Sequence, residues 1–134
     1  MEVRRGLTAA AAGTVLALTG TVAVSAPAVA AAPSAKLTIQ PTSSPDVFVV
    51  IVNVDADVPA GAPIGFVLRG DDPVFDDDLG VNVTGTQTFT GPVSLFAIVP
   101  RAALDEDRPG KDELYARFSA PGLNLTTNVV TGFF

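Results

Sequence analysis

A nearly unbroken apolar run, Val47 to Val54, is the feature that most constrains the fold of this chain. Seven of its eight residues are apolar, most of them β-branched, and Asn53 is the exception. Such a run predicts a strand that is buried on both faces or that lies in the core of a sandwich. It is too short for a membrane span, and Asn53 and Asp55 mark its end.

Shorter strand-like segments surround this run, and turn residues separate them. We expect further strands over Leu37–Ile39, Ile64–Arg69, Val81–Val83, Gln87–Thr90, Val93–Val99, Glu113–Ser119 and Leu123–Thr131, with a helical turn over Arg101–Leu104. In Glu113–Ser119 the alternation predicts that Leu114, Ala116 and Phe118 point inward. No window shows sustained helical periodicity, and turn signals recur about every ten residues. The sequence therefore predicts an all-β antiparallel β-sandwich of seven or eight strands, an immunoglobulin-like or C2-like Greek key.

The N-terminal segment has the layout of a secretory signal peptide. Arg4 and Arg5 precede an uncharged, mostly apolar stretch that ends in the small residues Ala28-Val29-Ala30. The alternative is a membrane anchor, because the apolar stretch is near spanning length. An anchor has no need of the Ala-x-Ala cleavage site, which favours the signal peptide. We predict a signal peptide over residues 1–32, a flexible leader over 33–36 and a sandwich domain over 37–134, secreted by the general route.

Charge and composition exclude several classes of function. Without Arg4, Arg5 and Glu2 the chain keeps 6 basic and 13 acidic residues, a net charge of −7. Nucleic acids and anionic membranes both require a basic face, so neither is an expected partner. The chain has no cysteine and no histidine, which removes disulfides, most transition-metal sites and the commonest general base.

Acidic residues gather in two segments that each lie between predicted strands. The first holds Asp71, Asp72, Asp76, Asp77 and Asp78, and the second holds Asp105, Glu106, Asp107, Asp112 and Glu113. If both loops fall at the same end of the sandwich, their carboxylates repel unless a cation compensates. Calcium takes six to eight oxygen ligands in flexible geometry and suits a secreted module. The sequence predicts a calcium site with ligands drawn from Asp71, Asp72, Asp76, Asp77, Asp105, Glu106, Asp107 and Asp112.

The calcium hypothesis has limits that the sequence itself sets. The second segment is not an EF-hand, because Gly110 stands at the sixth position from Asp105 but Ala116 stands where the bidentate Glu is required. The alternative is a pair of solvated acidic loops that keep the protein soluble. In that case Asp76 and Asp78 pair with nearby cations such as Arg69, Arg108 or Lys111.

Two aromatic residues and two sequons complete the candidate features. We expect Phe75 to pack the first acidic loop onto the end of the sandwich. Tyr115, the chain's one tyrosine, is expected to cover apolar surface while its hydroxyl stays in water. The glycosylation sequon occurs at Asn82-Val83-Thr84 and at Asn124-Leu125-Thr126.

The two acidic motifs resemble those of small secreted β-sandwich proteins of actinobacteria. The resemblance is carried by Asp71-Asp72-Pro73-Val74-Phe75-Asp76-Asp77 and by Leu104 to Asp107 with Asp112 to Ala116. It covers about half of the expected domain and implies no catalytic residue. The loops are also distantly similar to the calcium-binding loops of C2 domains, although the spacings of those loops do not match here.

These observations lead to a non-enzymatic function as the first hypothesis. We expect a secreted binding or structural module whose acidic loop end binds calcium. The alternative is a protein-binding module, an inhibitor or an envelope-associated subunit, whose acidic loops face a basic protein surface or a cell-envelope component. A small hydrolase with paired carboxylates is a third hypothesis, which requires a cleft as well as two acids.

Overall fold

In the described part of the chain, strands follow one another with short turns between them. The computed structural model describes residues 25–105 and 110–134. The elements are β1 Ser34–Pro41, β2 Val47–Val58, β3 Pro63–Gly70, β4 Asp78–Thr86, β5 Gly91–Pro100, the 3-10 helix η1 Arg101–Ala103, β6 Asp112–Ala120, β7 Leu123–Thr126 and β8 Val130–Gly132. The prediction of an all-β protein is confirmed.

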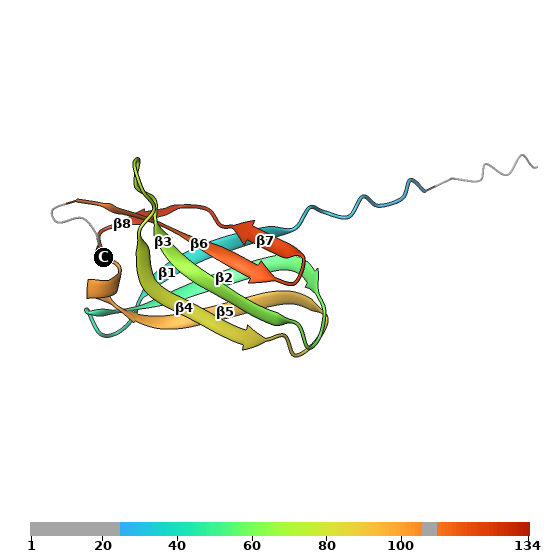
Figure 1. Cartoon of the computed structure of the whole chain (residues 1–134), viewed down its shortest axis with the longest axis horizontal. Coiled ribbons are helices and arrows are strands. Elements are labelled where there is room, and N and C mark those ends of the chain that lie inside the picture. The colour runs from blue at the N-terminus through green and yellow to red at the C-terminus, as the bar shows by residue number, and fades with distance from the viewer. Residues whose placement is uncertain (1–24, 106–109) are drawn as a thin grey trace, which may run out of the picture. The chain divides into compact units, whose positions relative to one another are not determined.

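Two antiparallel sheets pack face to face (Figure 1). One sheet, here called sheet A, has the strand order β1-β2-β5. The other, sheet B, has the order β4-β3-β6-β7, and β8 continues the same edge of β6 beyond β7. An immunoglobulin constant domain places its first, second, fifth and fourth strands in one sheet. Here the first, second and fifth strands share a sheet in the same way, but the fourth pairs with the third.

The core lies between the sheets and is built from alternate residues of each strand, as the period of two requires. Phe66 and Phe118, opposite each other in the β3–β6 pair, are its largest fully buried side chains. The buried apolar set is Leu37, Phe48, Val50, Val52, Val54, Val58, Ile64, Phe66, Leu68, Val93, Val99, Leu104, Leu114, Ala116 and Phe118. The inward orientation predicted for Leu114, Ala116 and Phe118 is confirmed.

The apolar run of β2 is a sandwich strand with unequal faces. Phe48, Val50 and Val52 point into the core and are buried. Val49 and Ile51 point to the outer face of sheet A and are only partly covered. Of the two alternatives for this run, the structure therefore shows the sandwich-core strand, with an apolar outer face left over.

Two predicted segments have a different structure from the expected one. β1 begins at Ser34, where the leader over residues 33–36 was expected, because Ser34 to Lys36 pair with Asn53 to Asp55 of β2. Gln87–Thr90 is a turn and not a strand, because the buried Gln87 amide donates to the carbonyl oxygens of Gly91 and Pro92.

The last predicted strand, Leu123–Thr131, is two strands. β7 and β8 are separated at Thr127, whose hydroxyl accepts a hydrogen bond from the Ala116 N–H at 2.9 Å. A side chain takes the place of a backbone partner at this point and interrupts the ladder. The predicted helical turn at Arg101–Leu104 is present as η1.

The predicted signal peptide falls mostly outside the described residues, which begin at residue 25. Residues 25–33 carry no regular secondary structure, and the compact unit begins at Ala31. Among residues 25–105 and 110–134, no helix has the length and apolar character needed to cross a membrane.

Candidate functional site

The described bases of both acidic loops lie at the same end of the sandwich. β3 ends at Gly70, which pairs with Leu114 near the start of β6. Just beyond this pair, the Asp71 N–H donates to the Glu113 carbonyl oxygen at 2.6 Å. The start of the first loop and the end of the second are thus neighbours at this end of the sandwich.

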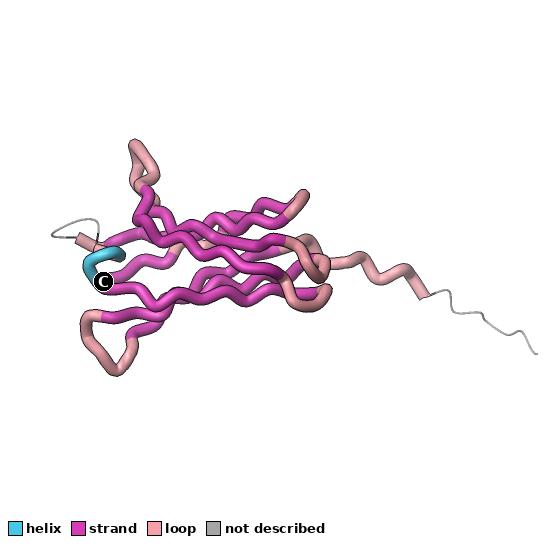
Figure 2. The backbone as a smooth tube through the Cα atoms, turned by 60° about the horizontal axis from the view of Figure 1, so that its bottom comes forward, coloured by secondary structure: helices cyan, strands magenta, loops and turns pink. Residues whose placement is uncertain are grey.

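The loop between β3 and β4, residues 71–77, stands away from sheet B (Figures 1 and 2). It is closed at its base by the Gly70 N–H, which donates to the Asp77 carbonyl oxygen at 3.0 Å. At its tip, Val74 is 76% exposed and Phe75 is 77% exposed. The expectation that Phe75 packs onto the sandwich end is wrong, because the loop turns its apolar pair outward.

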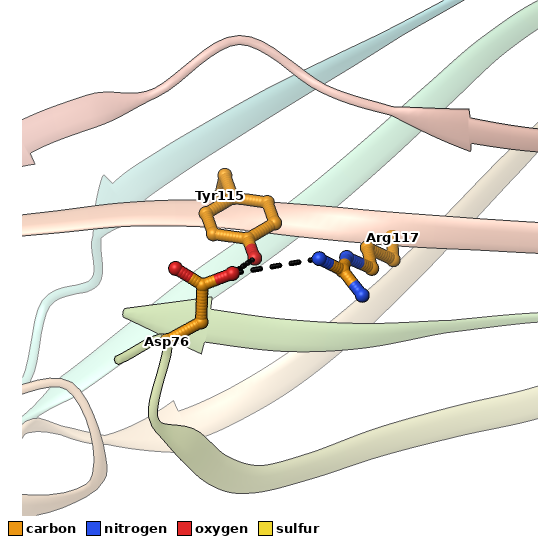
Figure 3. Close-up of polar contacts among 3 residues, drawn as sticks. All are labelled: Asp76, Tyr115 and Arg117. Atoms are coloured by element: carbon orange, nitrogen blue, oxygen red, sulfur yellow. Dashed lines mark hydrogen bonds and ion pairs between the residues drawn. The ribbon is translucent and has the colours of Figure 1, made fainter. Parts of the chain in front are cut away.

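Asp76 braces this loop against the outer face of sheet B (Figure 3). Its Oδ2 accepts a hydrogen bond from the Tyr115 hydroxyl at 2.5 Å and pairs with the Arg117 guanidinium at 3.4 Å. Both partners stand on β6, two positions apart and therefore on the same face. The loop therefore keeps a defined base while its tip is in solvent.

Tyr115 differs from its predicted role. The residue is 5% exposed and its hydroxyl donates to a carboxylate rather than to water. Burial, followed by the hydrogen bond to Asp76, raises the pKa of Tyr115, and the nearby Arg117 charge offsets part of that rise. The phenol thus stays protonated to higher pH than a free tyrosine and remains a donor to Asp76.

The Asp78 side chain takes part in the backbone structure at the start of β4. Its Oδ1 accepts a hydrogen bond from the Gly80 N–H at 2.9 Å, and Gly80 has φ +69°, a conformation that favours glycine. The register between β3 and β4 shifts here, since Val67 pairs with Asn82 but Arg69 pairs with Asp78. This carboxylate therefore shapes a β-bulge at the edge of sheet B.

The structure brings together only part of the predicted calcium site. Asp71, Asp72, Asp76 and Asp77 lie on the β3–β4 loop, Asp105 follows η1, and the buried Asp112 opens β6. Glu106 and Asp107 lie outside the described residues, as does Arg108. Within residues 25–105 and 110–134, no three acidic side chains are grouped so that they could hold a metal ion. Of the predicted charge pairings, Asp76 uses Arg117 instead of the cations that were expected.

A hollow on the outer face of sheet B was not predicted. It measures about 360 Å³, and its lining residues are Gly65, Phe66, Val67, Asn82, Thr84, Arg117, Phe118, Ser119, Asn124, Leu125 and Thr126. Both sequons contribute their Asn and Thr to it, because β4 and β7 flank β3 and β6. No carboxylate lines this hollow, so it lends nothing to the hydrolase hypothesis.

Comparison with known proteins provides no relative. No model of a protein family matches the chain, and neither a curated protein nor a solved structure matches it. The resemblance to actinobacterial sandwich proteins and to C2 loops stays a prediction. Any assignment of function rests on the chain's own geometry.

Proposed function

We propose that this protein is a secreted, non-enzymatic β-sandwich module that binds a basic partner through its acidic loop end. The partner is a cationic protein surface or a cell-envelope component that carries cationic groups. The observation that supports the proposal most is the tip of the β3–β4 loop, where Val74 and Phe75 are exposed between aspartates.

The apolar tip has the properties of a binding anchor. An aromatic side chain in solvent contributes nothing to the stability of the fold, yet it supplies a large rigid area to a complex. Asp76 fixes the base of the loop on Tyr115 and Arg117. A loop that is held at its base loses less conformational freedom on binding than a free one.

The surrounding charge selects the class of partner. Asp71, Asp77 and Asp78 are exposed beside the tip, and the chain has a net charge of −6. Clustered charge of one sign steers a partner of the opposite sign and mainly raises the association rate. The expected complex therefore forms quickly at low salt and is held by the apolar contact of Phe75.

The experiment measures binding to a defined cationic surface, poly-L-lysine on a biosensor, at several salt concentrations. We expect Asp71→Asn with Asp77→Asn to slow association, and Phe75→Ala to speed dissociation. The matched control for charge is Asp55→Asn with Asp57→Asn, two exposed acids on β2. The matched control for the aromatic anchor is Phe89→Ala, which is 64% exposed in the turn before β5.

Equal effects of the two double variants would contradict the proposal. The net charge changes by the same amount in both, so only a site at the loop end distinguishes them. An unchanged dissociation rate in Phe75→Ala would likewise remove the apolar anchor from the site.

Calcium binding is a second candidate, favoured by the hydrogen bond between Asp71 and Glu113 that joins the bases of the two loops. A cation bound by the native state raises the melting temperature by mass action. We expect thermal unfolding to shift upward by several degrees in about 5 mM calcium relative to chelator, given the millimolar affinity of extracellular sites. The same melting temperature in both buffers would contradict a calcium site. The acidic loop end would then be proposed as a protein-binding surface only.

A further inference from the structure

We propose that two copies of this chain associate edge to edge through β5, which joins their three-stranded sheets into one six-stranded sheet. The inference is independent of the acidic loop end. It rests on three observations. The edge strand β5 lacks the usual protection, an apolar strip lies beside it on the outer face, and the groove next to it is lined by uncharged residues.

β5 is a sheet edge without the usual protection. Edge strands are normally shortened, bulged, charged or covered, because their free N–H and C=O groups pair with other chains. Among the described edges, β7 and β8 have 4 and 3 residues, and β4 carries the bulge at Gly80. β1 is covered by the Asn128 amide, which bonds both the N–H and the carbonyl oxygen of Leu37. β5 has 10 residues, none charged, and its prolines stand near its ends at Pro92 and Pro100.

The outer side chains of β5 are apolar where the edge is free. Phe96 is 65% exposed and Ile98 is 69% exposed on the outer face of sheet A. Their neighbours across the β2–β5 pair are Ile51 and Val49, which are partly exposed as well. Four apolar side chains thus form a continuous strip on the outer face of sheet A, across β5 and the neighbouring β2.

The groove on the other side of this edge is also apolar. β4 and β5 are edges of opposite sheets and lie next to each other (Figure 1). Between them is a groove of about 310 Å³ lined by Leu79, Gly80, Val81, Asn82, Val83, Ala97, Ile98, Val99, Pro100 and Ala103, none of which is charged. A strand that pairs with β5 would cover both the strip and the mouth of this groove.

Charge identifies the occupant as a second copy. The chain carries a net charge of −6, so two copies repel at most surfaces, and a cationic partner is drawn to the acidic loop end. β5 and the residues that line the groove carry no charge, which allows like-charged copies to approach there. A two-fold axis beside β5 makes the new pair antiparallel, as all strand pairs here are, and places Phe96 and Ile98 of one copy against the same residues of the other.

The size of the contact predicts a weak dimer. The free edge between its prolines, Val93 to Val99, spans roughly 24 Å at about 3.4 Å per residue. With the strip and the groove mouth, such a pairing buries roughly 500 Å² per copy, less than the roughly 800 Å² of a standard interface. We therefore expect a Kd on the order of 10–100 μM.

Sedimentation equilibrium of the purified protein over a wide concentration range tests the proposal. We expect concentration-dependent dimers for the unmodified chain and at least a roughly tenfold weaker Kd for Ile98→Lys and for Phe96→Lys, because each puts a charge into the apolar strip and close to the same charge of the other copy. Phe89→Lys adds the same charge at an exposed aromatic outside the strip and leaves the Kd within about twofold.

Amide exchange provides a readout that needs no variant. The free-edge amides between Leu95 and Val99 exchange slowly at high protein concentration and quickly at low concentration if β5 pairs with its copy. A chain that stays monomeric at about 1 mM, well above the expected Kd, would overturn the proposal. Dimers that persist in Ile98→Lys and Phe96→Lys would overturn it as well, since another surface would then form the contact.

Discussion

The two sides of the sandwich differ in how the edge strands of sheet A are protected from pairing with another chain. On one side β1 faces β7 and β8, and on the other side β5 faces β4. The first side is closed by a single polar residue, since the Asn128 side chain supplies the acceptor and the donor that a further strand would supply to Leu37. On the second side no described residue has this role, and apolar side chains are exposed.

The difference shows that the side chain of one residue can satisfy the hydrogen-bonding groups of a sheet edge. An Asn side chain has the same hydrogen-bonding groups as a peptide unit, so one residue satisfies one step of a ladder. An edge that lacks such a residue stays available for pairing with another chain. The closed side is therefore expected to be sensitive to substitution, and the open side to be tolerant.

Asn128→Ala is expected to have the largest effect on stability. It removes two hydrogen bonds to the buried Leu37, each with a net contribution of about 0.5–1.5 kcal/mol, so the free energy of unfolding should fall by roughly 1–3 kcal/mol. Urea unfolding measures the change. Asn128→Asp keeps the acceptor for the Leu37 N–H and should lie between the wild type and Asn128→Ala.

Asn53→Ala is the matched control for this side. Asn53 also accepts a side-chain hydrogen bond, from Ser94 at 2.8 Å, but both residues are exposed on the face of sheet A. Its loss should change the free energy of unfolding by less than about 0.5 kcal/mol. A loss of unfolding free energy equal to that of Asn128→Ala would mean that closing the edge contributes no more than an exposed side-chain hydrogen bond.

Tyr115→Phe should have an intermediate effect, because its hydrogen bond braces a loop and not an edge. Loss of the bond to Asp76 should lower the free energy of unfolding by about 0.5–1.5 kcal/mol at neutral pH. The pKa of Tyr115 is raised in the folded state, so its contribution is complete below pH about 10 and is lost as pH rises through the folded value.

The difference between the wild type and Tyr115→Phe should therefore shrink in alkaline solution. Tyrosinate absorbance follows this titration without ambiguity, because the chain has one tyrosine. A difference that grows above pH 10 would mean that folding lowers the pKa of Tyr115 instead of raising it.

Ile98→Lys should have the smallest effect on the stability of the single chain. Ile98 is 69% exposed on the open side, so the free energy of unfolding in dilute solution should change by less than about 0.5 kcal/mol. Urea unfolding at low protein concentration measures the value for the isolated chain. A loss as large as that of Asn128→Ala would show that the open side is part of the monomer's own core.

Local pattern was enough to predict most strands. The alternation in Glu113–Ser119 identified Leu114, Ala116 and Phe118 as core residues, and the prolines and glycines marked the turns between strands. These signals act within a few residues, so they are visible in a single sequence.

Contacts between distant residues were not predictable in this way. Asn128 and Leu37 are 91 positions apart, and Tyr115 and Asp76 are 39 positions apart. The break between β7 and β8 depends on the Thr127 hydroxyl and its bond to Ala116. An apolar residue in a loop also has no local signal for its direction, which is why Phe75 was expected to be packed.

The long separation between Leu37 and Asn128 also sets an order of assembly. A chain made from its N-terminus contains β1 and β2 early, but the amide that completes the outer edge of β1 is present only after residue 128 has been added. Contacts of such high sequence separation form late and slow the folding reaction. The outer edge of the first strand is thus among the last contacts to be completed.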